Sequence, residues 1–121
     1  MLSIITNNAK QLDQVLAAMA NEKRRRVVHI LGLQPASIGQ LAKQLRSSLP
    51  AIHRHIKVLE KAKLVRRKKS GRVNFLALDR SGLLLIQDWV AQYHAYWGTE
   101  EETLENYVAS IKKTEKVKKI K

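Results

Sequence analysis

The middle third of the sequence constrains the fold most, because its apolar pattern changes there from a helical to a strand-like period. Ser37 is predicted to cap a short helix whose apolar residues recur three and four positions apart. Ser48 is predicted to cap a second helix that runs to about Ala62. Beyond that helix a basic run, the turn residue Gly71 and a β-branched and aromatic segment predict a β-hairpin.

The segments on either side carry the apolar periodicity of helices. We predict helices over about 9–19, from the cap Asn21 to near Gly32, from Asp79 or Ser81 through Gly98, and from Glu100 to Lys112. Residues 1–112 are therefore predicted to form one domain that is mainly α, with five or six helices and a small β-hairpin. The polar, lysine-rich residues 113–121 are predicted to be a disordered tail.

The net charge of +13 is concentrated in one block of the chain. Residues 46–72 hold ten basic side chains and one acidic side chain, whereas residues 73–121 hold seven of each. A basic block in an ordered domain is typical of a protein that binds a polyanion, usually nucleic acid and sometimes an anionic membrane surface. The alternative is a charged face that is merely solvated.

The helix predicted after Ser48 carries this charge on one side. Its inner stripe comprises Ile52, Ile56 and Leu59. Helical geometry therefore places Arg54, Lys57 and Lys61 on the opposite face. Two helices joined by a short turn and followed by a basic hairpin make a winged helix-turn-helix. The second helix of such a unit fits the DNA major groove, and the hairpin reaches the flanking backbone or minor groove.

The residue types present argue against disulfides, a metal site and catalysis. The chain has no cysteine, which excludes disulfides, thiolate metal sites and cysteine nucleophiles. It has no glycine-rich phosphate loop and no nucleophile motif, so we expect neither an enzyme nor a cofactor. Asp88 and His94 are six residues apart and cannot share a metal within one helix, and His53 and His55 point apart on theirs. We therefore expect no metal site, although an intersubunit site involving His94 stays open.

The sequence also bears on location. The first ten residues lack the charged and apolar regions of a secretory signal. No apolar run approaches the roughly 20 residues that a bilayer span requires. We therefore expect a cytoplasmic, nucleoid-associated protein with double-stranded DNA as its partner and no membrane association.

Several blocks of residues resemble one known family. These blocks are ANEKRRRVV at 20–28, IGQLA at 38–42, SLPAIHRHIKVL at 48–59, AKLV at 62–65 and GR at 71–72. Together they resemble the ArsR-type repressors, and the resemblance covers about residues 12–107. It implies a homodimer that represses an operator, often its own promoter, and releases it when a signal arrives. The thiolate and zinc sensor sites of that family have no counterpart in these residues, so the inducer stays unnamed.

The resemblance also implies which residues contact DNA. The contacts that it implies are Ser48, Leu49, Ala51, His53 and Arg54. The charge pattern adds Lys57 on the same helix, and Arg66, Arg67, Lys68, Lys69 and Arg72 as phosphate contacts on the hairpin. Leu49 and Ala51 offer only apolar contact, so direct base reading falls on His53 and Arg54. Arg46 occupies a turn position that is frequently glycine in the family. We expect His55 to be a hydrogen-bonded core histidine.

The terminal helix is apolar around most of its girth, which favours a second contact surface. The predicted dimer interface combines the first and terminal helices through Leu12, Val15, Leu16, Met19, Trp89, Tyr93, Tyr96 and Trp97. The alternative is that Tyr96 and Trp97 cover the core of their own chain. In a two-fold dimer, the two copies of the helix predicted after Ser48 would lie about 34 Å apart. This distance matches successive major grooves of DNA and therefore a palindromic operator. Two other functions stay open: a nonspecific architectural DNA-binding protein and a winged helix that binds proteins.

Overall fold

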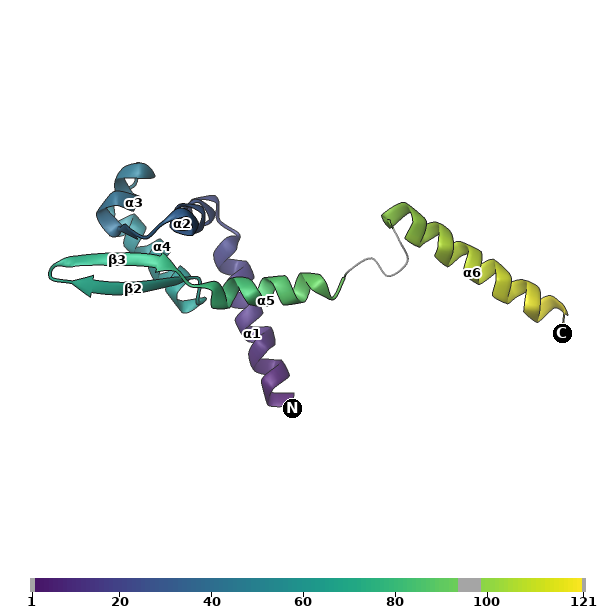
Figure 1. The fold of residues 1–121 in the computed structure, drawn as a ribbon. Coiled ribbons are helices and arrows are strands. Elements are labelled where there is room, and N and C mark those ends of the chain that lie inside the picture. The colour runs from purple at the N-terminus through teal and green to yellow at the C-terminus, as the bar shows by residue number, and fades with distance from the viewer. Residues whose placement is uncertain (1, 94–98, 121) are drawn as a thin grey trace. The chain divides into compact units, whose positions relative to one another are not determined.

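The structure, a computed structural model, describes the backbone of residues 2–93 and 99–120 (Figure 1). The chain divides into two compact units, Met1–Trp89 and Val90–Lys121, where the sequence predicted one domain over residues 1–112. Within the described ranges there are six helices and three short strands, so the expected mainly α fold with a small β-hairpin is confirmed. Their order is α1 Leu2–Met19, α2 Glu22–Leu33, β1 Ala36–Ser37, α3 Ile38–Gln44, α4 Leu49–Lys61, β2 Val65–Ser70, β3 Val73–Leu78, α5 Arg80–Ala91 and α6 Glu100–Ile120.

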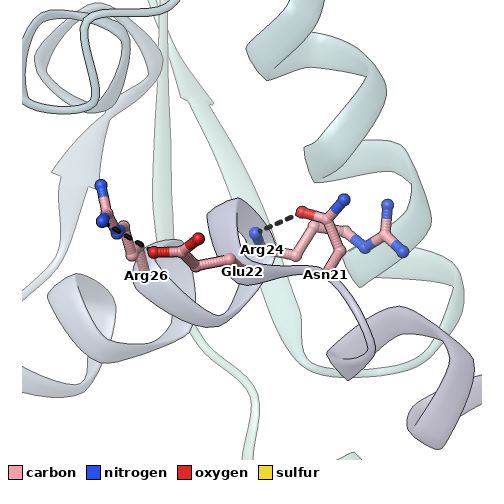
Figure 2. Close-up of polar contacts among 4 residues, drawn as sticks. All are labelled: Asn21, Glu22, Arg24 and Arg26. Atoms are coloured by element: carbon pink, nitrogen blue, oxygen red, sulfur yellow. Dashed lines mark hydrogen bonds and ion pairs between the residues drawn. The ribbon is translucent and has the colours of Figure 1, made fainter.

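The helix starts follow from capping side chains, as the sequence predicted. Asn21 accepts a hydrogen bond from the amide of Arg24 at 3.0 Å, which begins α2 (Figure 2). Ser37 begins α3 through a capping box, in which its hydroxyl accepts from the Gln40 amide and the Gln40 side chain accepts from the Ser37 amide. Ser48 begins α4 by accepting from the Ala51 amide at 3.3 Å. Each cap satisfies a backbone donor that the first helical turn leaves without a partner.

Three helix boundaries differ from the sequence prediction. Helix α1 begins at Leu2 rather than near residue 9, and α5 ends at Ala91 rather than at residue 98. Helix α6 continues to Ile120, through the segment that we expected to be disordered. Lysine has a high helix propensity, and positive charge is favourable at a helix C-terminus, so a lysine-rich end is compatible with a helix.

The sheet has the order β1-β3-β2 and is antiparallel throughout. Strands β2 and β3 pair from Val65 with Leu78 to Ser70 with Val73, and only two residues join them. The first of these, Gly71, has a φ of 61°, which glycine adopts without steric strain. The hairpin extends beyond the helices at its tip (Figure 1). Strand β1 was not predicted, because two residues are too few to show a periodic pattern.

The core of the first unit lies between helices α1 to α4 and the inner face of the sheet. Its fully buried side chains include Val15, Val27, Leu41, Ile52, Ile56, Leu59 and Leu64, each 0% exposed, and Leu76 at 1%. Val15 was predicted to contact a second chain, but its burial inside its own unit leaves no surface for a partner. We therefore remove Val15 from the predicted interface. Its place on the apolar stripe of α1 is explained by packing against the core.

Candidate nucleic-acid interface

Helix α4 presents a cationic face to solvent. Ile52, Ile56 and Leu59 are fully buried, and they fix the rotation of the helix against the core. His53, Arg54 and Lys57 are all exposed, as is Lys61 one turn further on. The orientation that the sequence predicted for Arg54 and Lys57 is therefore confirmed. An exposed row of positive side chains along a helix is suited to phosphate and base-edge contacts.

The first turn of α4 combines a cap with an apolar surface. The hydroxyl of Ser48 is engaged by the Ala51 amide, so this side chain starts the helix as well as standing at the predicted interface. Leu49 is 52% exposed, and Ala51 is half-buried. The exposure of both side chains is compatible with the apolar contact to thymine methyl groups, which stays a prediction.

The turn between α3 and α4 is held by a backbone hydrogen bond to α3 and by a side chain of α2. Arg46 has a φ of 50°, in the left-handed region where glycine is favoured, so the arginine adopts the backbone conformation for which glycine is the usual choice. The Ser47 amide donates to the Ala42 carbonyl at 3.0 Å. The ammonium of Lys23, on α2, donates to the Ser47 hydroxyl. This role of Lys23 was not predicted from the sequence, because no local pattern links residues 24 positions apart.

The basic hairpin, which we call the wing (residues 65–78), divides its charges between two faces. The strand register places Arg67 and Lys69 on the face of the buried Leu76, and Arg66 and Lys68 on the face of the exposed Phe75. Lys68, Lys69 and Arg72 are exposed near the tip. The structure therefore brings the predicted hairpin residues together on one element that adjoins α4.

Two of the predicted wing contacts are paired within the chain. The Arg67 guanidinium lies 2.8 Å from a carboxylate oxygen of Glu60 on α4. The Arg66 guanidinium lies 3.6 Å from the Asp79 carboxylate, which also accepts a hydrogen bond from the Ser81 amide. Burial opposes ionisation of Asp79, but the bonds from Ser81 and the charge of Arg66 lower its pKa below the usual range. The base of the wing is thus tied to α4 and to the start of α5.

Glu60 is a positioning residue that was not predicted from the sequence. It is the one acidic residue in the basic block over residues 46–72, and that isolation was the available signal. Both side chains of the Glu60 and Arg67 pair are about two-thirds or more buried, at 31% and 27% exposed. Because Glu60 belongs to α4 and Arg67 to β2, the pair couples the orientation of the wing to that of the helix.

His55 was expected in the core, and the structure places it half-buried on the flank of α4. Burial lowers its pKa, and the positive charges of Arg24, Lys23 and Arg54 lower it further. The neutral imidazole is therefore favoured in the folded chain. Helices α2 and α4 both contribute to this cationic neighbourhood.

The arginines at the start of α2 act mainly on helix α1. Arg24 donates from Nε to the Ala18 carbonyl at 2.6 Å, and Arg25 donates to the Met19 carbonyl at 2.9 Å. These bonds satisfy carbonyl groups at the C-terminus of α1, which have no partner within the helix. Arg26 instead pairs with Glu22 at 2.8 Å on the surface of α2 (Figure 2). The basic run at residues 24–26 is therefore largely structural.

The predicted interface residues other than Val15 differ in exposure. Leu12, Leu16 and Met19 on α1 are half-buried, and Met19 packs against the core of its unit. Trp89 is 37% exposed and Tyr93 is 71% exposed. Tyr96, Trp97 and His94 lie outside the described residues. The part of the chain that the structure describes holds no cluster of three or more metal-ligating side chains and no helix able to cross a membrane.

Helices α3 and α4, their short turn and the wing define a winged helix-turn-helix, and known proteins match this part of the chain. A family model described as a helix-turn-helix domain matches residues 19–68. The HTH-type transcriptional regulator Rv2034 of Mycobacterium tuberculosis is 36% identical over 75 residues, which are 62% of this chain and 70% of that relative. Solved structures of several regulators are similar as well.

The crystal structure of an ArsR family transcriptional regulator is 30% identical, with a TM-score of 0.69, over 76% of this chain and 95% of that one. The domain Mb0332 of Mycobacterium bovis, a winged helix-turn-helix described as homodimeric, shares the fold at 16% identity, with a TM-score of 0.59, over 76% of this chain and 87% of that one. This chain belongs to the ArsR family of helix-turn-helix regulators. It is a transcriptional regulator and not an enzyme.

Proposed function

We propose that the chain is a homodimeric repressor that recognises a palindromic operator in double-stranded DNA at the nucleoid. In this proposal α4 lies in the major groove, where His53 and Arg54 contact base edges and Lys57 contacts phosphate. The wing holds the flanking backbone through Lys68, Lys69 and Arg72. The observation that carries the proposal is the outward cationic face of α4, next to a basic wing, in a chain of the ArsR family.

The distribution of charge supports binding to DNA rather than to a protein. Arg54, Lys57 and Lys61 give α4 three exposed positive side chains, and its one acid, Glu60, pairs with Arg67. Neutralising phosphates releases counterions, which supplies affinity without sequence information. Sequence preference must then come from the short list of side chains that reach base edges.

A homodimer would match the two-fold symmetry of a palindromic operator. Two copies related by a two-fold axis would place two α4 helices in successive major grooves, about 34 Å apart. The winged helix-turn-helix domain Mb0332, which shares this fold, is described as homodimeric. The exposed and half-buried apolar residues of α1 and α5 provide surface for such contacts.

The first experiment is selection of bound duplexes from a random pool, followed by affinity measurements on the selected site and on shuffled DNA. We expect a palindrome and a specificity ratio above about 10³. A ratio near one would contradict sequence-specific repression and favour a nonspecific architectural protein. Transcription in vitro from a promoter that overlaps the selected site should fall when the chain is added, and a rise would identify an activator instead.

Arg54→Ala tests the proposed base contact directly. We expect the affinity for the selected site to fall by about 1–3 kcal/mol, with relaxed preference at the base pair that Arg54 contacts. Lys10→Ala is the matched control, because it removes one exposed positive charge from α1 rather than from α4. An unchanged operator preference in Arg54→Ala would contradict the proposal that Arg54 contacts a base.

A further inference from the structure

Arg46, in the turn between α3 and α4, carries a basic side chain on a backbone conformation that favours glycine. Its φ of 50° lies in the left-handed region, where the Cβ atom of any other residue crowds a carbonyl oxygen. The side chain is exposed, and among the residues that the structure describes its guanidinium takes part in no hydrogen bond or ion pair. No bond within the described chain therefore explains an arginine at a position suited to glycine.

Two hydrogen bonds that end α3 fix the backbone on either side of Arg46. The Arg46 amide donates to the Lys43 carbonyl at 3.3 Å, and the Ser47 amide donates to the Ala42 carbonyl at 3.0 Å. This pair of bonds is typical of a helix that ends with a left-handed residue. The ammonium of Lys23 bonds the Ser47 hydroxyl and holds the same turn from α2. The point at which the Arg46 side chain leaves the backbone is therefore fixed relative to α4.

The chain around Arg46 offers its guanidinium no carboxylate. Residues 23–59 contain eight lysines and arginines and no aspartate or glutamate. Lys43 and Arg54, on the two helices that the turn joins, are exposed as well. An exposed guanidinium in such surroundings favours an anion from outside the chain, and its planar fork forms paired hydrogen bonds with phosphate oxygens.

The place of Arg46 in the fold indicates which phosphate it meets. In a helix-turn-helix the first helix crosses the DNA backbone, and the N-terminal residues of the second helix contact base edges. The turn that joins them therefore passes next to the phosphates at the edge of the major groove. Arg46 lies in this turn, two residues before Ser48, the N-cap of α4.

We propose that Arg46 binds a phosphate of the DNA backbone at the edge of the groove that α4 enters. The contact rests on the proposed placement of α4 in the major groove. It adds affinity and fixes the position of the turn, but it reads no base. The cost of a left-handed arginine is then explained by a contact that forms only when DNA is bound.

Lys63, at the other end of α4, provides a matched comparison within the chain. It is exposed, and its φ is 58°. It also follows a helix C-cap, because its amide donates to the Glu60 carbonyl at 3.0 Å and the Leu64 amide donates to the Leu59 carbonyl at 2.9 Å. Any benefit of a positive charge at a helix C-terminus therefore applies to both residues. They differ in lying at opposite ends of α4, whose 13 residues span about 20 Å.

Glycine substitutions in the full chain test the contact. In Arg46→Gly, affinity for the selected operator and for shuffled DNA should fall by the same factor, about fivefold to tenfold. The slope of log affinity against log salt should flatten by about 1, because one phosphate contact is lost. Arg46→Lys should keep this slope but bind more weakly than the wild type, because lysine cannot form the paired hydrogen bonds.

Lys63→Gly is the matched control, since it relieves the same backbone conformation and removes the same charge. Its affinity should stay within about twofold of the wild type, with an unchanged salt slope. Both glycine variants should remain folded, because glycine adopts the left-handed conformation without steric cost. Circular dichroism of each variant verifies the helix content.

Cleavage of DNA from a single attached reagent tests the position of the contact, since the chain has no cysteine of its own. An iron chelate on Arg46→Cys should cleave the selected operator at the groove edge of each half-site, and the same chelate on Lys63→Cys should not cleave there. Replacing the phosphate at the cleaved position by an uncharged methylphosphonate should weaken binding of the wild type. The same replacement should leave binding of Arg46→Gly nearly unchanged, because the contact is already lost.

The outcomes separate this contact from the proposed repressor function. A wild-type affinity and salt slope in Arg46→Gly, in a chain that still selects a palindrome, would overturn the contact and leave the proposed function in place. Equal losses in Arg46→Gly and Lys63→Gly would overturn the contact too. A loss confined to the selected operator would identify Arg46 as a base-reading residue instead. If the wild type prefers no sequence but Arg46→Gly still flattens the salt slope, the contact stands and specific repression fails.

Discussion

Gly82, at the start of α5, lies closer to neighbouring backbone than any side chain would allow. A Cβ atom there would stand 2.7 Å from the carbonyl oxygen of Ala62 and 2.9 Å from that of Lys63. The Gly82 amide also donates to the Lys63 carbonyl at 2.8 Å. Because backbone atoms cannot rotate away, Gly82→Ala should lower the free energy of unfolding by about 1–3 kcal/mol, measured by chemical denaturation.

Gly32 provides the matched comparison. It lies within α2, and a Cβ atom there would meet nothing within 4 Å. Gly32→Ala should therefore raise the free energy of unfolding by about 0.5–1 kcal/mol through helix propensity. Opposite signs at the two glycines are expected, and equal losses at both would contradict the close approach at Gly82.

His55 gives the stability of the chain a pH dependence. Burial and the neighbouring positive charges lower its pKa in the folded state, so the unfolded chain binds its proton more readily. Stability should then fall as the pH drops below about 6.5, where an unfolded histidine titrates, and level off below the lowered folded-state pKa. In His55→Gln the slope of unfolding free energy between pH 7.5 and 5.5 should be shallower than in the wild type. An identical slope in the wild type and in His55→Gln would contradict the assignment of this pH dependence to His55.

At the scale of elements, the ion pair of Glu60 and Arg67 joins α4 to β2. Since both side chains are partly buried, a double-mutant cycle with Glu60→Gln and Arg67→Gln should give a coupling of about 0.5–1 kcal/mol. The surface pair of Glu22 and Arg26 is the control, because both side chains are mostly exposed and lie within one helix. Its coupling should be smaller, about 0.3–0.5 kcal/mol. A larger coupling energy for Glu22 and Arg26 than for Glu60 and Arg67 would contradict the proposed coupling between α4 and the wing.

Elements that are marked by a local sequence signal, such as a capping side chain, were predicted from the sequence. The starts of α2, α3 and α4 follow from Asn21, Ser37 and Ser48, because a capping side chain bonds an amide only three residues away. Strand β1 escaped prediction because its pairing with β3 joins residues about 40 positions apart. The extent of α6 escaped it because a lysine-rich segment has the composition of both a solvated tail and a helix end.

At the scale of the whole molecule, affinity for DNA should divide into a sequence-dependent part from α4 and a charge-dependent part from the wing. The variant Lys68→Gln, Lys69→Gln removes two exposed positive charges near the wing tip. Binding to selected and shuffled duplexes should weaken equally, and the slope of log affinity against log salt should flatten by about 2. A loss confined to the selected site would instead identify these lysines as base-reading residues.

The sequence by itself determined that the chain is mainly α with a basic hairpin and that Arg54 and Lys57 face outward, because helical and strand periods and caps act over a few residues. Tertiary structure alone decided that Val15 is buried, that Lys23 bonds Ser47 and that Glu60 binds Arg67. Such facts depend on which elements become neighbours when the core closes, and no local spacing encodes them.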